Sequence, residues 1–201
     1  MPGEGVRSRP QNPSAVVVIG VDPGSQHCGY GVVVARGGRL GALDGGVFTL
    51  PRAAALERRL AALHAGVDEL LARYQPTALA VEDLYFGRNV QTAMAVGQAR
   101  GVVLAAAGAR SVPCFSYTPQ QVKQAVCGTG AADKGQVQRM VAALLSLPAP
   151  PEPDHAADAL AVAICHLHRL PTGVAIASAA ASARATGAAR KTRSATREVA
   201  L

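Results

Sequence analysis

The ten residues AVVVIGVDPG at positions 15–24 decide the architecture of this chain. Residues 15–21 are a continuous apolar run rich in β-branched side chains, which is typical of a strand buried on both faces. Asp22-Pro23-Gly24 then turns the chain and leaves a carboxylate at the end of that strand. Similar runs follow at residues 29–35 and, more weakly, at residues 40–48. Three strands joined by short turns predict an antiparallel meander.

Helical and extended patterns alternate after the meander. Residues 53–74 carry apolar side chains at helical spacing, and Pro76 ends that helix. We expect a strand at residues 78–84, a helix at 90–107 and a fifth strand at 111–117. Alternation of this kind after three meandering strands predicts one α/β domain with a mixed sheet.

Three more helices are expected near the C-terminal end of the domain. Thr118-Pro119 has the form of an N-cap followed by proline and predicts a helix at residues 119–127. Asp133 and Gln136 resemble a capping box for a helix that runs to residue 145. The last helix follows the prolines at 151–153 and ends near Arg169, with Asp154 as its candidate N-cap.

Composition favours one domain with a polyanionic partner. The chain has 201 residues, of which 49% are hydrophobic and only 3% aromatic, so the core must be built from Ala, Val, Leu and Ile. A formal net charge of +7 indicates nucleic acid as the partner class. Of this charge, +4 lies in residues 171–201. A DNA-binding tail and a solvated tail that aids solubility therefore both remain open.

The two ends of the chain differ in composition from its middle. Residues 1–14 and the basic low-complexity segment 171–201 lack periodicity and are predicted to be disordered, which leaves residues 15–170 as the domain. The four cysteines show no C-x-x-C spacing, so we expect small buried thiols rather than a zinc site or a disulfide frame. Neither a signal peptide nor an apolar run of roughly 18 residues is evident, and we expect a cytoplasmic protein with no membrane partner.

Four side chains at the ends of predicted elements are candidates for catalysis. Asp22 ends a buried strand, Glu82 lies in an otherwise apolar strand, and His155 and Asp158 share the first turn of the last helix. If these ends meet, divalent cations would offset the repulsion between the carboxylates. Two Mg²⁺ or Mn²⁺ ions about 3.5 to 4 Å apart could then support phosphodiester hydrolysis. Three of the residues also have a structural interpretation, since Asp22 could form only a turn, Asp158 could favour only its helix terminus and His155 could be structural. Glu82 is harder to explain in this way, because an unpaired buried carboxylate is costly.

Five motifs in register carry a resemblance to a known family. They are IGVDPGS at residues 19–25 with GYGV at 29–32, VEDLYF at 81–86 with Asn89, GQARG at 97–101, QVKQ at 121–124 and HAADAL at 155–160. Together they closely resemble the RuvC family of Holliday junction resolvases over residues 16–169. The resemblance implies a ribonuclease H-like fold, in which three antiparallel strands and then two parallel strands form one five-stranded mixed sheet flanked by helices.

The resemblance also implies an activity and an assembly. It predicts a homodimeric crossover junction endodeoxyribonuclease that nicks two strands of a four-way DNA junction symmetrically, in recombination and repair. A branch-migration helicase complex is expected as a further partner. The family's catalytic acids match Asp22, Glu82 and Asp158. His155 takes the remaining metal-ligand position, where many members have Asp and some have His.

Two features of the site follow from the residues at these matched positions. Imidazole suits Mn²⁺ better than Mg²⁺, so His155 predicts a preference for Mn²⁺. Asp154, next to His155, could be a helix cap or an extra metal ligand.

The same resemblance implies a set of DNA contacts. Tyr85 matches the position that wedges into the junction, and the residues beside it in the same loop are Phe86, Arg88 and Asn89. One of the two rings, Phe86 in particular, could instead belong to the core. Lys123 and Lys134 match positions that contact phosphates, although either could be a solvated helix residue.

Three alternatives remain open from the sequence. The strand-Asp-Gly-turn-strand opening also occurs in actin-like ATPases and sugar kinases, which normally need a second related domain. A family of pre-ribosomal RNA nucleases shares the fold but is usually shorter and lacks the aromatic loop. A junction-binding scaffold without catalysis is the third alternative, against which the four candidate ligands argue.

Overall fold

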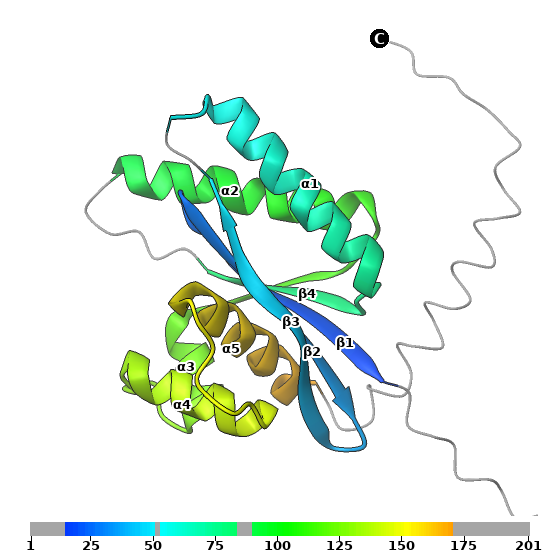
Figure 1. Ribbon diagram of the computed structural model, residues 1–201, viewed down its shortest axis with the longest axis vertical. Helices are drawn as coiled ribbons and strands as arrows, with labels where there is room; N and C mark the ends of the chain where they lie inside the picture. The colour runs from blue at the N-terminus through cyan, green and yellow to red at the C-terminus, as the bar shows by residue number, and fades with distance from the viewer. Residues whose placement is uncertain (1–14, 51–52, 84–89, 171–201) are drawn as a thin grey trace, which may run out of the picture.

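The computed structural model describes residues 15–50, 53–83 and 90–170, which form a mixed sheet covered by helices on both faces (Figure 1). The strands are β1 (Val16–Asp22), β2 (His27–Arg36), β3 (Arg39–Thr49), β4 (Ala78–Glu82) and β5 (Cys114–Tyr117). The five-stranded sheet has the order β3-β2-β1-β4-β5. The first three strands are antiparallel, and β4 lies parallel to β1 and to β5. The predicted α/β fold with this mixed sheet is confirmed.

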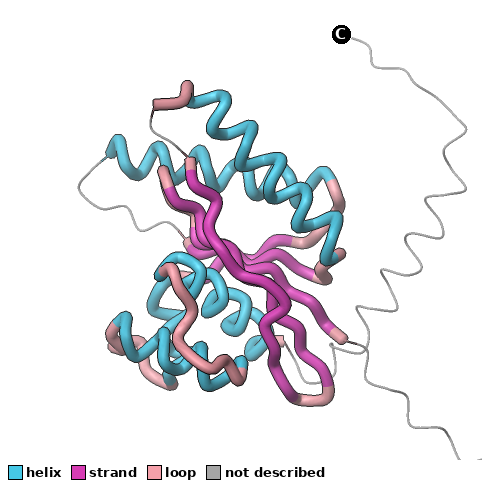
Figure 2. The backbone as a smooth tube through the Cα atoms, in the orientation of Figure 1, coloured by secondary structure: helices cyan, strands magenta, loops and turns pink. Residues whose placement is uncertain are grey.

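The helices divide into two layers on either side of the sheet (Figure 2). One layer contains α1 (Leu56–Tyr74) and α2 (Val90–Ala109). The other contains α3 (Pro119–Cys127), α4 (Lys134–Leu145) and α5 (Asp154–Arg169). Two hydrophobic clusters result, one under each layer, and β1 contributes Val16 and Val18 to one and Ile19 and Val21 to the other. This double burial explains why β1 is apolar at successive positions instead of alternating.

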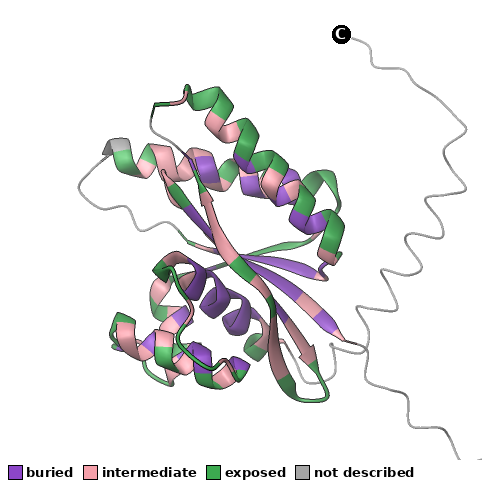
Figure 3. Cartoon of the chain, in the orientation of Figure 1, coloured by how far each residue is buried: buried purple, intermediate pink, exposed green. Residues whose placement is uncertain are grey.

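Helix α5 is the most deeply buried helix and lies against the middle of the sheet (Figure 3). Three glycines on the neighbouring strands make its close approach possible. A Cβ atom added at Gly20 would overlap the carbonyl oxygen of Ala159, and one added at Gly29 would overlap the carbonyl oxygen of His155. At Gly31, an added Cβ would lie 2.7 Å from Leu160. The missing side chains let the first turn of α5 reach the end of β1.

Several predicted element boundaries are confirmed and others are wrong, since α1 begins three residues later than expected and β4 ends two residues earlier. Thr118 caps α3 in a full capping box with Gln121, and Asp133 caps α4 by accepting a hydrogen bond from the backbone N–H of Gln136. Asp154 does not cap α5, because the N-cap is Pro153 and no side-chain cap bond forms. Strand β5 begins three residues later than expected, because the chain first turns at Ser111, whose φ is 56°.

The four cysteines are free, but they do not share one environment. Cys28 and Cys165 are buried as expected, and burial is the main cause that raises the pKa of the Cys28 thiol to about 12. Cys127 is half-buried. Cys114 is exposed, which corrects the expectation of a buried thiol, because it lies on the edge strand β5. Within the described ranges, no helix combines the length and apolar character needed to cross a bilayer.

Candidate active site

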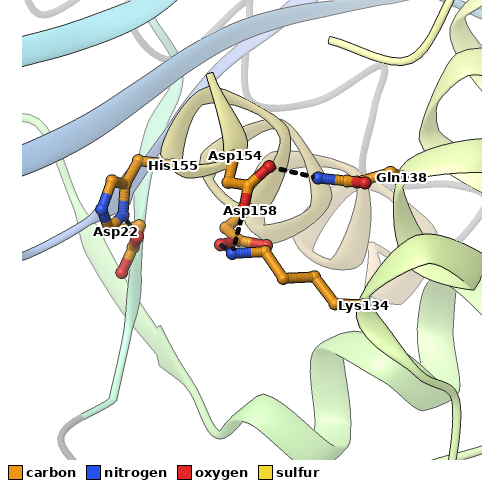
Figure 4. Close-up of polar contacts among 6 residues, drawn as sticks. All are labelled: Asp22, Lys134, Gln138, Asp154, His155 and Asp158. Carbon is orange, nitrogen blue, oxygen red and sulfur yellow. Dashed lines mark hydrogen bonds and ion pairs between the residues drawn. The ribbon is translucent and has the colours of Figure 1, made fainter. Parts of the chain in front are cut away.

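The carboxyl ends of β1 and β4 place two acidic residues side by side. The strands are parallel and adjacent, and Val21 pairs in register with Val81. The next residue in each strand is therefore an acid, Asp22 in β1 and Glu82 in β4. The first turn of α5 lies beside this edge of the sheet and adds His155 and Asp158 (Figure 4). The four candidate residues come from three distant segments and meet in one place.

Three of the four side chains form a compact set of ligating atoms. His155 Nδ1 lies 2.8 Å from Asp22 Oδ2. One ligand atom from each of Asp22, His155 and Asp158 lies within 4.8 Å of the others, a spacing that could hold a metal ion. The Asp22 side chain is 15% exposed and that of His155 is 42% exposed, so the group opens to solvent on the histidine side. These residues can bind a divalent cation through oxygen and imidazole nitrogen.

Glu82 adjoins Asp22, because the two residues end neighbouring parallel strands at the same level. Burial is the main cause that raises the pKa of Glu82 to about 8, and the charges of Asp22 and Asp158 raise it further while Lys123 opposes them. Burial also raises the pKa of Asp158, against the opposing effect of Lys134. Full ionisation of the cluster is therefore unfavourable without a further positive charge, which a bound divalent cation would supply.

Two lysines face the same acidic cluster. Lys123 and Lys134 line a cavity of about 240 Å³ together with Glu82 and Asp158. The ammonium group of Lys134 lies 3.5 Å from Asp158 Oδ2 and 2.9 Å from Asp154 Oδ2. Lys123 is on α3 and Lys134 is on α4. Both predicted phosphate-binding lysines therefore lie beside the predicted metal ligands, although they come from different helices.

Two further residues, Asp154 and His27, border the ligand group. Asp154 is not a member of the group formed by Asp22, His155 and Asp158. His27, which no sequence motif singles out, stacks its ring on His155 with centroids 5.9 Å apart and an interplanar angle of 23°. Its position in the sequence offered one indication of this contact. Gly29 of β2 pairs with Asp22, so His27, two residues earlier in β2, lies close to the same end of β1. His27 therefore lies beside the ligand group without belonging to it.

The predicted junction-contacting loop follows β4. Its residues Tyr85, Phe86, Arg88 and Asn89 lie outside the described residues. Their assigned roles therefore rest on the sequence alone.

A ribonuclease H-like sheet with two carboxylates at adjacent strand ends, and with a histidine and a third carboxylate in the helix beside them, is typical of metal-dependent nucleases. The model of the family described as "Crossover junction endodeoxyribonuclease RuvC" matches residues 18–166. The chain belongs to the RuvC family of crossover junction endodeoxyribonucleases.

Individual relatives agree with this assignment over nearly their whole length. The chain is 49% identical over 160 residues to the RuvC endonuclease of Heliobacterium modesticaldum, covering 80% of this chain and 99% of that protein. It is 51% identical over 162 residues to the enzyme of Rubrobacter xylanophilus, covering 80% and 90%.

Solved structures agree in fold as well. The Thermus thermophilus RuvC structure superposes with a TM-score of 0.72 at 42% identity, covering 76% of this chain and 94% of that one. The structure of T. thermophilus RuvC in complex with a Holliday junction substrate gives a TM-score of 0.74 at 43% identity, with 76% and 93% covered. The yeast mitochondrial resolvase Ydc2 shares the fold, with a TM-score of 0.53 at 12% identity and 85% of each chain covered.

Family membership decides between the alternatives that the sequence left open. The actin-like and pre-ribosomal RNA nuclease interpretations are wrong, because the matched family spans almost the whole described domain. The scaffold without catalysis is also excluded, since the chain is a crossover junction endodeoxyribonuclease.

Proposed function

We propose that this chain resolves four-way DNA junctions by paired, symmetric nicks during recombination and repair, with Asp22, Glu82, His155 and Asp158 as the catalytic metal ligands. The observation that carries the proposal is the group of Asp22, His155 and Asp158, whose ligand atoms lie within 4.8 Å of one another at the strand ends. Glu82 extends the group, because it lies beside Asp22 at the end of the neighbouring strand and lines a cavity together with Asp158.

The ligand set fits divalent cations, since three carboxylates and an imidazole supply the oxygen and nitrogen donors that Mg²⁺ and Mn²⁺ accept. Two such cations, when bound, supply an activated water and stabilise the leaving oxygen of the phosphodiester. Asp22 lies beside Glu82 in the sheet and contacts His155, so its carboxylate could ligate a cation together with either residue. The hydrogen bond between His155 and Asp22 orients the imidazole, and the stacked His27 ring supports that orientation.

The DNA-binding part of the proposal rests on charge and on the loop after β4. Lys123 and Lys134 bring positive charge to the cavity beside the acids, where a scissile phosphate would otherwise be repelled. We assign Tyr85 to base stacking at the junction centre, with Phe86, Arg88 and Asn89 contributing to the same contact. Two symmetric nicks require two copies of the site, so we propose a homodimer, which acts with a branch-migration helicase complex in the cytoplasm.

We further propose that residues 15–170 carry the catalytic function. The matched family region, residues 18–166, falls inside this range. We regard residues 1–14 and the basic residues 171–201 as accessory, and both ends lie outside the described residues. A chain truncated to residues 15–170 is expected to retain nicking activity.

The decisive experiment follows nicking of a synthetic four-way junction with Mg²⁺ or Mn²⁺. We expect nicks at symmetric positions in two opposing strands. Asp22→Asn should abolish them while leaving junction binding measurable by gel shift. Asp68→Asn, which makes the same change on the exposed face of α1, serves as the matched control and should cleave like the wild type. Wild-type rates in Asp22→Asn would refute the assignment.

The metal preference is tested by one substitution. Because an imidazole ligand suits Mn²⁺ better than Mg²⁺, wild-type activity with Mn²⁺ should exceed that with Mg²⁺. His155→Asp replaces nitrogen with oxygen and should narrow that ratio. Equal rates with both metals across a full titration of the wild type would contradict the proposed preference.

A further inference from the structure

Asp154 has partners that neither a helix cap nor a metal ligand would have. Its Oδ2 lies 2.9 Å from the ammonium nitrogen of Lys134, and its Oδ1 accepts a 2.7 Å hydrogen bond from Nε2 of Gln138 (Figure 4). Lys134 and Gln138 are one turn apart on α4, just as Asp154 and Asp158 are one turn apart on α5. Asp154 therefore links the two helices directly beside the acidic cluster.

Lys134 is shared between two carboxylates with different environments. The Asp154 side chain is 59% exposed, whereas that of Asp158 is 29% exposed and belongs to the ligand group. A cation held by Asp158 would repel the ammonium group, which lies only 3.5 Å from the same carboxylate. Asp154 offers Lys134 a second anion, already at the shorter distance of 2.9 Å.

We propose that Asp154 is a positioning residue that holds and neutralises Lys134, so that Asp158 can bind a cation while the lysine stays in the cavity facing the acids. This inference rests on the proposed function of the Asp22, His155 and Asp158 group. Gln138 fixes the orientation of the Asp154 carboxylate, so that one oxygen faces Lys134. Without Asp154, Lys134 would have only Asp158 as an acidic partner among the described residues and would compete with the metal for it.

The test measures Mn²⁺ binding by titration calorimetry on the full chain without DNA. Asp154→Asn should raise the dissociation constant about two- to fivefold, the range expected for loss of one partly exposed ion pair. Asp154→Glu, which can reach Lys134 again, should restore most of the affinity. Glu152 lines one surface pocket with Lys134 and Asp154 but has no ion pair with Lys134, so Glu152→Gln removes one negative charge nearby and should bind Mn²⁺ like the wild type. Unchanged affinity in Asp154→Asn would overturn the proposal.

A double-mutant cycle separates an effect through Lys134 from a direct effect of the Asp154 charge. In a Lys134→Gln background, adding Asp154→Asn should change the Mn²⁺ dissociation constant by less than about 1.5-fold, because the residue it acts through is gone. An equal loss in both backgrounds would show that Asp154 acts on the metal directly and would overturn the positioning role. Thermal melting of each variant in EDTA checks that the fold is intact.

Asp22→Asn distinguishes failure of this inference from failure of the proposed function. If Asp22→Asn binds Mn²⁺ as tightly as the wild type, the site itself is wrongly placed and both proposals fail. If Asp22→Asn loses binding but Asp154→Asn does not weaken it, the metal site stands and only the role of Asp154 is wrong.

Discussion

Glu82→Gln is expected to abolish cleavage and yet to stabilise the metal-free protein, by an amount that grows with pH. Burial and the charges of Asp22 and Asp158 raise the pKa of Glu82 from 4.5 to about 8. Between these values the native state retains a proton that the unfolded chain has lost. The free energy of unfolding of the wild type therefore falls as pH rises through this window, and the loss is complete above pH 8. The amide that replaces the carboxyl group carries no charge at any of these pH values, so the variant does not lose stability by ionisation of a buried group.

The size of the effect follows from the width of that window. One pKa unit corresponds to about 1.4 kcal/mol, so the full shift would correspond to at most about 5 kcal/mol. Glu82 titrates together with Asp22, and the solvent-facing side of the site screens part of the repulsion. We therefore expect the variant to be more stable than the wild type by about 2 kcal/mol at pH 9, and by much less at pH 5.

Urea denaturation in EDTA at several pH values between 5 and 9 measures this difference. Glu69→Gln makes the same change at an exposed position on α1. Its free energy of unfolding should differ from that of the wild type by an amount that does not grow with pH. Adding Mn²⁺ should raise the denaturation midpoint of the wild type more than that of Glu82→Gln, because a neutral amide is a weaker ligand than a carboxylate. A stability difference that stays constant or shrinks as pH rises would refute the electrostatic reasoning.

Three further predictions concern packing and DNA contact. Gly20→Ala would push a Cβ atom into the carbonyl oxygen of Ala159. Urea denaturation should therefore show that the free energy of unfolding falls by about 1 to 3 kcal/mol, and a smaller fall would mean that α5 can move aside. Lys123→Gln should lower the salt dependence of junction binding by about one unit of slope, and an unchanged slope would exclude a phosphate contact. Tyr85→Ala should reduce nicking much more than gel-shift affinity, whereas equal losses would argue against a wedge at the junction.

Local sequence patterns were sufficient to predict the five strands and five helices that the structure describes, although several boundaries differ. The run at residues 15–21 is apolar without alternation because β1 is buried on both faces, and that property is visible in a single segment. Thr118 and Asp133 cap the helices that they precede, since capping depends on residues only three positions away. Asp22 and Glu82 were identifiable as carboxylates at strand ends for the same reason.

Predictions failed where the outcome depends on segments distant in sequence. Asp154 has the sequence position of a cap, but α4 brings Lys134 and Gln138 to its carboxylate and the helix begins at Asp154 itself. Cys114 was expected to be buried, but β5 is the last strand of the sheet and leaves it exposed. His27 was missed because its contact with His155 depends on the packing of α5 against β2.

The sequence by itself determined the types of group available to the site: carboxylates at strand ends, an imidazole in a helix turn and lysines in two later helices. The tertiary structure alone decided which of them interact. The glycines of β1 and β2 that lie beneath α5 determine how closely this helix approaches the sheet. That close approach brings His155 within 2.8 Å of Asp22. Ion pairs and ligand groups form only within a few ångströms, so their membership depends on how whole elements pack.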